Sequence, residues 1–146
     1  MAFQFISEVT DCEYKSAVER AKPKSWLKTV SAFANTAGGT IAFGVDDETH
    51  EVAGLAAAQS DADFVSECVK ARIDPLPRFE VEAESADGRD VLLVRVHADA
   101  HPPYYYCADG RREAYVRVGN QSVIALPEVL NELILRGTNR TWDGLD

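Results

Sequence analysis

The sequence predicts an α/β domain in the broad sense (α+β), with a mixed, largely antiparallel sheet flanked by about three helices. Two patterns predict this class. Apolar residues recur with helical spacing in three separate segments, and short β-rich apolar runs bounded by turns lie around them. The chain has 146 residues, a length that fits one domain with a hydrophobic core of its own.

Helical periodicity marks three segments. They cover residues 21–37, 60–73 and 126–136. In the first segment, Pro23 lies in the first turn and Gly38-Gly39 follows the last turn, as is typical of helix starts and ends. In the second, Ser60 is the predicted N-cap. In the third, Pro127 lies in the first turn and Gly137 is predicted to follow the end.

Short apolar runs around these helices are predicted to be strands. They cover residues 40–45, 51–55, 78–84, 90–96 and 114–118. Residues 13–15 are either a strand end or a turn into the first helix. The polar segments 46–50 and 86–89 fit hairpin turns, which make the neighbouring strands antiparallel. Residues 101–106 fit a loop that contains two prolines and three tyrosines.

The last residues show no further periodic element. Residues 138–146 are therefore predicted to begin a linker, and residues 1–137 to form the domain. A linker at this position implies a further C-terminal region.

Net charge limits the classes of function. The formal net charge is −9, which excludes a generally basic protein, whereas phosphate binding depends on lysine and arginine. The charge is uneven, because residues 1–40 carry five basic and four acidic side chains, whereas residues 41–146 carry ten and twenty. A local basic face near the N-terminus is compatible with these counts.

Other features favour a cytoplasmic protein that makes no membrane contact. The N-terminus lacks the basic and apolar regions of a signal peptide, and no run approaches the ~18 apolar residues of a membrane helix. The three cysteines lie far apart without zinc-ligand spacing, so we expect reduced thiols and no zinc site.

Four segments in this order resemble the Schlafen AlbA-like (divergent AlbA) domain family. They are Glu8 with Glu13-Tyr14-Lys15, residues 30–47 with the sequence VSAFANTAGGTIAFGVDD, residues 52–55, and residues 114–119 with the sequence AYVRVG. The second segment is the most specific. The resemblance covers about residues 8–137 and implies the Schlafen AlbA-like fold. It also implies a DNA-binding domain at the N-terminus of a bacterial transcriptional regulator.

The resemblance implies a second function as well, because some animal Schlafen proteins cleave tRNA and rRNA with three carboxylates. The matching positions here are Glu8, Glu13 and Asp46, with Asp47 as an open alternative to Asp46. Converging carboxylates could hold Mg²⁺ or Mn²⁺ and make the domain a metal-dependent RNase. Glu8 and Glu13 are five residues apart, so the chain between them must bend. The ordinary alternative is an ion-paired Glu13 and a solvated acidic turn.

Basic side chains near these carboxylates form a candidate nucleic-acid-binding strip. It consists of Lys15, Lys22, Lys24, Lys28 and Arg117, to which Arg111 and Arg112 could add. A basic strip of this kind would contact phosphates of DNA or RNA. A solvated helix face gives the same pattern, and that alternative stays open.

Two further groups have mainly structural interpretations. Asn35, Gly38, Gly39 and Gly44 are predicted to shape the corner between the first helix and the strand after it, with Asn35 bonding backbone groups. The tyrosines of residues 104–106 are expected to pack, although stacking on unpaired bases is the alternative. A third class of function, a protein-interaction or oligomerisation module such as a homodimer, agrees with the acidic charge.

Overall fold

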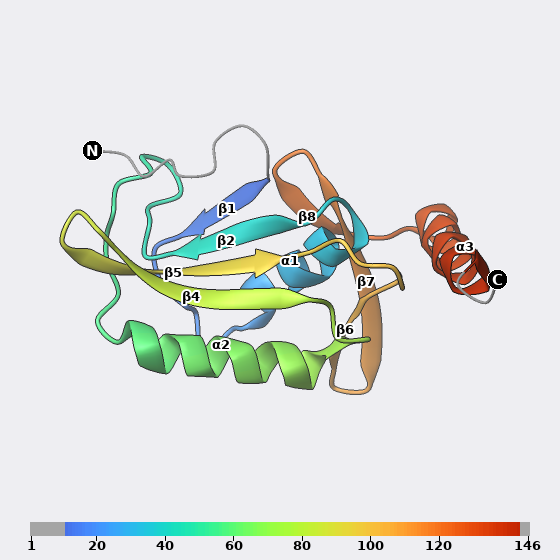
Figure 1. The fold of residues 1–146 in the computed structure, drawn as a ribbon, viewed down its shortest axis with the longest axis horizontal. Coiled ribbons are helices and arrows are strands. Elements are labelled where there is room, and N and C mark those ends of the chain that lie inside the picture. The colour runs from blue at the N-terminus through green and yellow to red at the C-terminus, as the bar shows by residue number, and fades with distance from the viewer. Residues whose placement is uncertain (1–10, 144–146) are drawn as a thin grey trace.

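Two four-stranded sheets with three helices make up the part of the chain that the structure describes. The structure is a computed structural model that describes residues 11–143, and the side chains of residues 11–138. The elements, shown in Figure 1, are β1 Cys12–Lys15, α1 Lys24–Asn35, β2 Gly39–Phe43, α2 Ala58–Arg72, β3 Ile73–Asp74, β4 Phe79–Ala86, β5 Arg89–Val96, β6 Tyr105–Ala108, β7 Arg111–Val118, β8 Gln121–Ile124 and α3 Pro127–Asp143.

The first sheet has the strand order β1-β2-β5-β4. β1 runs parallel to β2, and the other neighbours are antiparallel. The two central strands are the most apolar, and every residue of β2 is buried. β4 and β5 are joined at Asp87-Gly88, where both residues have positive φ (52° and 73°), as a two-residue hairpin loop of the favoured twist requires.

The second sheet has the order β3-β6-β7-β8, with antiparallel neighbours throughout. α1 lies between the two sheets. Its residues from Trp26 to Asn35 are buried except for Lys28, because one face packs on the first sheet and the other on β7. The main core therefore combines Trp26 and Phe33 of α1 with Phe43 of β2 and Tyr104 before β6.

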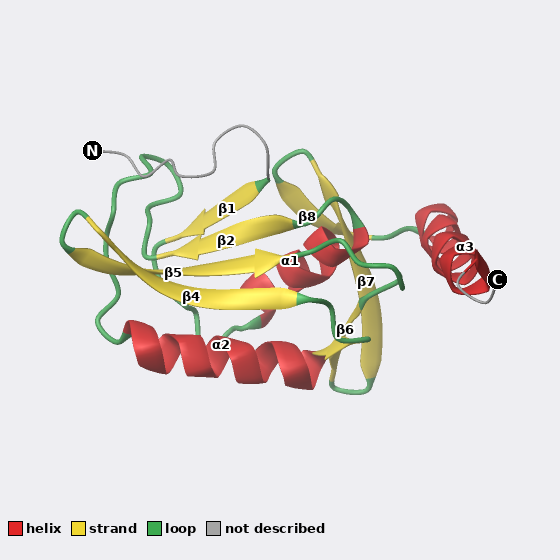
Figure 2. Cartoon of the chain, in the orientation of Figure 1, coloured by secondary structure: helices red, strands yellow, loops and turns green. Residues whose placement is uncertain are grey.

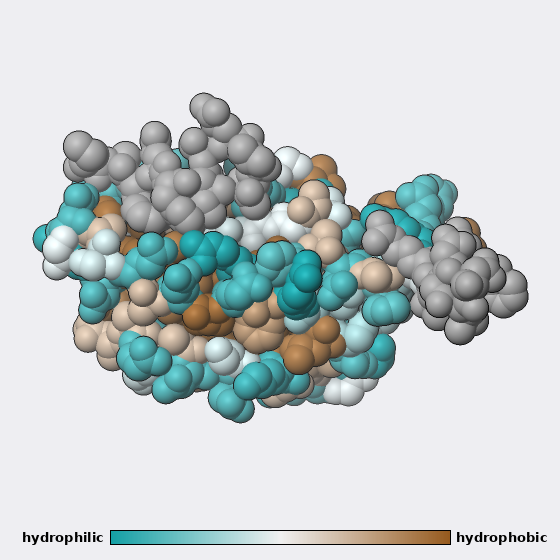
Figure 3. All heavy atoms as spheres, in the orientation of Figure 1, coloured by the Kyte–Doolittle hydropathy of each residue, from teal (hydrophilic) through white to brown (hydrophobic). Residues whose placement is uncertain are grey.

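α2 packs beside α1 against β4 and β5 through Val65 and Val69. On the face that shows β4 and α2, groups of hydrophilic side chains alternate with a band of apolar ones that runs between these two elements (Figure 3). A smaller apolar cluster, which includes Ala42, Val45 and Leu93, lies on the opposite face of the first sheet.

α3 extends away from both sheets (Figure 2). Leu133 is buried, and Gly137 lies so close to the loop before β6 that a Cβ atom would overlap the carbonyl oxygen of Pro102. Within the described residues, no helix is long and apolar enough to cross a membrane.

The structure confirms the predicted fold class, with a mixed α/β arrangement and mostly antiparallel strands. It corrects several details. The strands divide between two sheets because α1 separates them. Residues 51–55 form only one bridge, Val45 to Val52. Ser60 lies inside α2, whose N-cap position is Ala57. α3 does not end at Gly137 but continues to Asp143. This glycine allows the helix to approach the Pro102 carbonyl closely. The boundary between domain and linker stays a prediction.

Candidate nucleic-acid interface

An open groove of about 460 Å³ lies where β1, α1, the loop after β2 and the turn between β7 and β8 meet. We call it the β1 groove. Its lining residues are Cys12, Glu13, Tyr14, Lys15, Ser25, Lys28, Asp47, His50, Arg117 and Asn120. Polar and aromatic side chains from four separate parts of the chain therefore converge here.

A network of hydrogen-bonded charges forms one wall of the β1 groove. The Arg117 side chain, only 5% exposed, donates from Nε to Asp11 Oδ2 at 2.8 Å and from its terminal nitrogen to Glu13 Oε1 at 2.9 Å. The Thr29 hydroxyl lies 3.1–3.2 Å from the Glu13 oxygens and 2.8 Å from Ser122 Oγ. Charge-assisted bonds of this kind fix β1 against α1 and β7.

Two lysines, Lys15 and Lys28, line the same groove and differ in whether an acidic partner offsets their charge. Lys15 Nζ lies 2.7 Å from Glu19 Oε1, so its charge is partly compensated. Lys28, the one residue of α1 between Trp26 and Asn35 that is not buried, has no hydrogen bond or ion pair within the described residues. Lys28 is thus the cation best placed to accept an anionic ligand.

An aromatic pair lines the groove beside these lysines. The rings of Tyr14 and His50 stack with centroids 4.0 Å apart and planes 30° apart. Burial, and next the neighbouring Cys12, raise the pKa of Tyr14 to about 12, so the phenol stays neutral near neutral pH. His50 has a φ of 60°, in the left-handed region that non-glycine residues seldom adopt.

Asp46 shapes the loop that carries His50. Its Oδ1 accepts backbone N–H bonds from Glu48 and Thr49, both at 2.9 Å, and the His50 N–H donates to the Asp46 carbonyl. The bonds from Thr49 and then Glu48 hold the pKa of the Asp46 carboxyl below its usual range. The sequence left Asp46 and Asp47 open as the third carboxylate. Asp47 lines the β1 groove, whereas the Asp46 carboxylate bonds backbone N–H groups of its own turn.

The described residues do not fit a divalent-cation site. Among them, no group of three or more His, Cys, Asp or Glu side chains could hold an ion. Glu13 already accepts bonds from Thr29 and Arg117, and a metal ion beside that guanidinium would be repelled. Glu8 lies outside the described residues. The three-carboxylate site with Mg²⁺ or Mn²⁺, and the RNase that depends on it, stay predictions.

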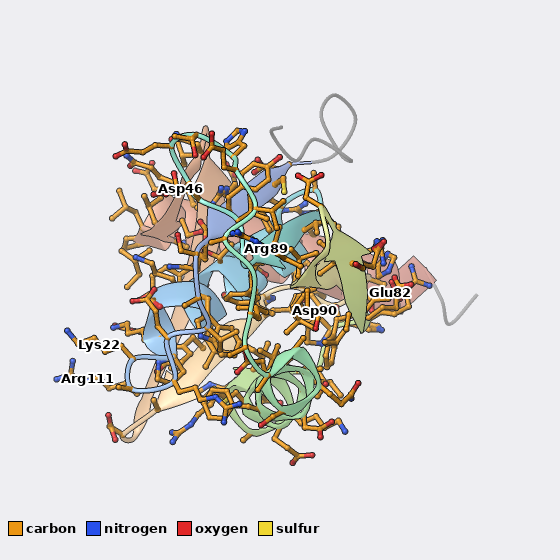
Figure 4. All side chains as sticks on the ribbon, turned by 90° about the vertical axis from the view of Figure 1, so that its left-hand side faces the viewer. Lys22, Asp46, Glu82, Arg89, Asp90 and Arg111 are labelled. Carbon is orange, nitrogen blue, oxygen red and sulfur yellow. The ribbon has the colours of Figure 1, made fainter. Side chains whose placement is uncertain are left out.

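Of the remaining members of the predicted basic strip, Arg117 lines this groove, whereas the lysines Lys22 and Lys24 and the arginines Arg111 and Arg112 do not. Lys24 Nζ lies 3.3 Å from Glu113 Oε1, and Arg112 pairs with Asp74 at 3.0 Å. Figure 4 shows Lys22 and Arg111 pointing outward on one side of the molecule, separate from Asp46. Arg117 is enclosed by carboxylates, so a phosphate would have to displace them.

Asn35 joins α1 to the second sheet. Its amide nitrogen donates to the carbonyls of Tyr104 and Tyr115 at 3.0 and 2.8 Å, and its oxygen accepts the Tyr104 N–H at 2.7 Å. One turn earlier, the Ser31 hydroxyl bonds the Tyr104 carbonyl and the Tyr115 N–H. Asn35 therefore bonds backbone groups, but these groups are remote in sequence and do not lie at the predicted corner between α1 and β2.

The other structural residues shape the path after α1. Gly38 has a φ of 77° and Gly44 a φ of 97°, which favour glycine. A Cβ atom at Gly39 would overlap the ring of Phe33. Tyr104 and Tyr106 are buried in the core, and Tyr105 lies under Arg112, with 4.5 Å between guanidinium carbon and ring centroid. The tyrosines therefore pack, as predicted, but the predicted loop 101–106 is wrong at its end, because β6 begins at Tyr105.

Comparison with known proteins identifies the family. The family model described as Schlafen, AlbA_2 matches residues 8–126. The chain belongs to the Schlafen AlbA_2 family. The matched region contains every described lining residue of the β1 groove and ends just before α3.

Two solved structures are similar to this Schlafen AlbA_2 domain. One is the N-terminal domain of a protein from Nitrosomonas europaea related to the ATP-dependent DNA helicase RecG, with 30% identity, a TM-score of 0.55, and coverage of 80% of this chain and 83% of that one. The other, the DIP2311 protein from Corynebacterium diphtheriae, has 23% identity and a TM-score of 0.64. That match covers 83% of this chain but 23% of the Corynebacterium chain, and it shows similarity of fold alone.

Several residues of the β1 groove escaped the sequence analysis. The sequence predicts a polar turn at His50, and it singles out Tyr14 only as part of the Glu13-Tyr14-Lys15 motif. Asn120 of the groove, and Ser122 of the hydrogen-bonded wall, follow the predicted strand 114–118, after which no further strand is predicted. The aromatic pair forms between residues 36 positions apart, and no local pattern reveals such a contact.

Proposed function

We propose that this Schlafen AlbA_2 domain binds nucleic acid through the β1 groove. The observation that carries the proposal is Lys28, a cation without an acidic partner in the described part of the chain, which faces the same groove as Lys15 and the Tyr14–His50 pair. Lysines contact phosphates, and aromatic rings contact bases. The similarity to the N-terminal domain of a RecG-related protein supports the same function.

The acidic net charge of −9 sets the character of this binding. With Lys15 and Lys28 as the phosphate contacts, affinity is weak and sensitive to salt. Two contacts imply a fall of about tenfold between roughly 50 and 200 mM salt. Because phosphate contacts carry no sequence information, the preference for particular sequences is low. We further propose that the domain serves a transcriptional regulator, to which it supplies a weak contact with DNA.

The test is fluorescence anisotropy of labelled DNA and RNA oligonucleotides at several salt concentrations. The variant Lys15→Glu/Lys28→Glu should weaken binding to every sequence alike. Lys70→Glu/Arg72→Glu, which also reverses two charges, is the matched control, because both residues are exposed on α2, which packs on β4 at the sheet edge opposite β1. Equal losses for both variants, or affinity unchanged by salt, would refute binding through the groove.

A further inference from the structure

We propose that the β1 groove accepts one unpaired nucleotide of a single strand, with the base stacked on the Tyr14–His50 pair and its phosphate at Lys28. This inference rests on the proposed function and specifies its ligand. It assigns the Tyr14–His50 pair to recognition and makes single-stranded nucleic acid, DNA or RNA, the preferred form.

The size of the groove favours an unpaired nucleotide. A volume of about 460 Å³ is within the range of small-ligand sites, which run from about 300 to 1,000 Å³. A duplex presents its bases only at the bottom of its grooves, so a small concave site cannot reach their faces. An unpaired base exposes its whole face, and single-strand binders use aromatic side chains against such faces.

The aromatic pair is held in place before any ligand arrives. Tyr14 lies in β1 and packs against the apolar cluster of Val45 and Leu93. His50 stacks on Tyr14 and is fixed by the turn that Asp46 organises. Backbone strain at a non-glycine residue such as His50 is found mainly where the surroundings enforce it and function uses it. A platform fixed in advance loses little conformational entropy on stacking.

The charges around this platform allow weak binding of one phosphate. Arg117 is shared between Glu13 and Asp11, so this ion-paired wall keeps one net negative charge, and Lys28 and Lys15 must attract the phosphate against it. Asp47 has no partner of that kind in the described part of the chain and faces the groove together with Lys28. Asp47→Asn should therefore raise affinity for a single strand. Glu48→Gln, an exposed change in the same loop outside the groove lining, should have little effect.

The tyrosines of residues 104–106 and two of the phenylalanines offer no equivalent surface. Tyr104 and Tyr106 are buried, and Tyr105 is covered by Arg112. Phe64 and Phe33 lie under arginine side chains as well. The Tyr14–His50 pair is the one stacked ring pair beside an uncompensated lysine within the described residues.

The experiment measures affinity by anisotropy for oligothymidylate, for oligouridylate, for a blunt DNA duplex and, in competition, for a free mononucleotide. Both single strands should bind at least about fivefold more tightly than the duplex, in line with the strength of one base–aromatic stack. His50→Ala should weaken single-strand binding by at least about fivefold and leave duplex binding unchanged. Tyr14→Phe, which keeps the ring, should bind like the unmodified protein.

A second measurement does not depend on any variant. A single strand that carries a fluorescent aminopurine base should lose fluorescence on binding, because stacking quenches that base. Binding without quenching would overturn the inference. Competition by the free mononucleotide would support the inference, because the groove takes one base and one phosphate.

The two proposals fail in distinguishable ways. If duplex and single strand bind equally, and Lys28→Glu weakens both while His50→Ala changes neither, the stacking inference is wrong and binding through the groove stands. If no nucleic acid binds at all, both are wrong. Melting curves of each variant identify a change that merely unfolds the domain.

Discussion

At the scale of single residues, Arg117 is the clearest case where position decides the role. The sequence placed it in a basic strip, and the structure encloses it between Asp11 and Glu13 above the Phe33 ring. Side chains in such a position stabilise the fold, because removing one partner of a largely buried ion pair leaves the others uncompensated. Phosphate contact by Arg117 stays a prediction.

Substitution of Arg117 separates these two roles. Arg117→Ala should lower the free energy of unfolding by about 3 kcal/mol, since Glu13 and Asp11 lose their cation. Arg117→Lys should lie between, because lysine keeps the charge but lacks the planar fork. Urea denaturation measures both. Unchanged stability of Arg117→Ala together with a loss of nucleic-acid affinity would assign Arg117 to phosphate binding instead.

Asn35 is the second residue whose substitution is informative. Asn35→Ala should lower the free energy of unfolding by about 1–3 kcal/mol, because the buried Tyr104 and Tyr115 backbone groups lose their partner. Thermal melting followed by circular dichroism measures the loss. Asn35→Asp, which keeps an acceptor and loses the donor, should also destabilise. An unchanged melting temperature in both variants would show that these bonds contribute nothing.

At the scale of elements, the sequence predicted local structure well where periodicity or turn residues are strong. α1, β2, β5 and the hairpin between β4 and β5 follow directly from such signals. It failed where tertiary contacts decide. β8 is short and partly exposed, without an apolar run to mark it. The position of α1 between two sheets depends on Ser31 and Asn35, whose partners lie about 70–85 residues away.

Gly137 gives a test at this scale. In most helices, glycine to alanine stabilises by about 1 kcal/mol. Here Gly137→Ala should destabilise the domain, because the new methyl group overlaps the Pro102 carbonyl and pushes α3 away. Denaturant titration gives the sign. The control is Thr138→Ala, at the neighbouring exposed position of the same helix. A more stable Gly137→Ala variant would contradict the described contact.

At the scale of the whole molecule, the proposed binding of nucleic acid by a chain with a net charge of −9 requires a local group of basic side chains. The sequence predicts a basic segment within residues 1–40 and names Lys15 and Lys28 as its phosphate contacts, but selecting the lysines that share a groove needs the structure. That selection depends on which side chains share the β1 groove and which pair with carboxylates, as Lys24 does with Glu113. The transcriptional role and the cytoplasmic location stay predictions.

Metal binding is also a property of the whole domain. Because Glu13 and Asp46 are both engaged in bonds of their own, Mg²⁺ or Mn²⁺ at millimolar concentration should leave the melting temperature unchanged. A melting temperature that rises with Mn²⁺, and falls back in Glu8→Ala and Glu13→Ala, would contradict this expectation. Metal-dependent cleavage of structured RNA, abolished by the same two substitutions, would establish the RNase.

Amide chemical shifts, measured during titration with a single-stranded oligonucleotide, test directly the claim that nucleic acid binds in the β1 groove. Binding in this groove predicts shifts that concentrate in residues 12–15, in the loop 46–50 and in the turn 119–122, while α2 and β4 change little. Shifts that concentrate instead around Lys22 and Arg111, or on α2 and β4, would contradict the claim.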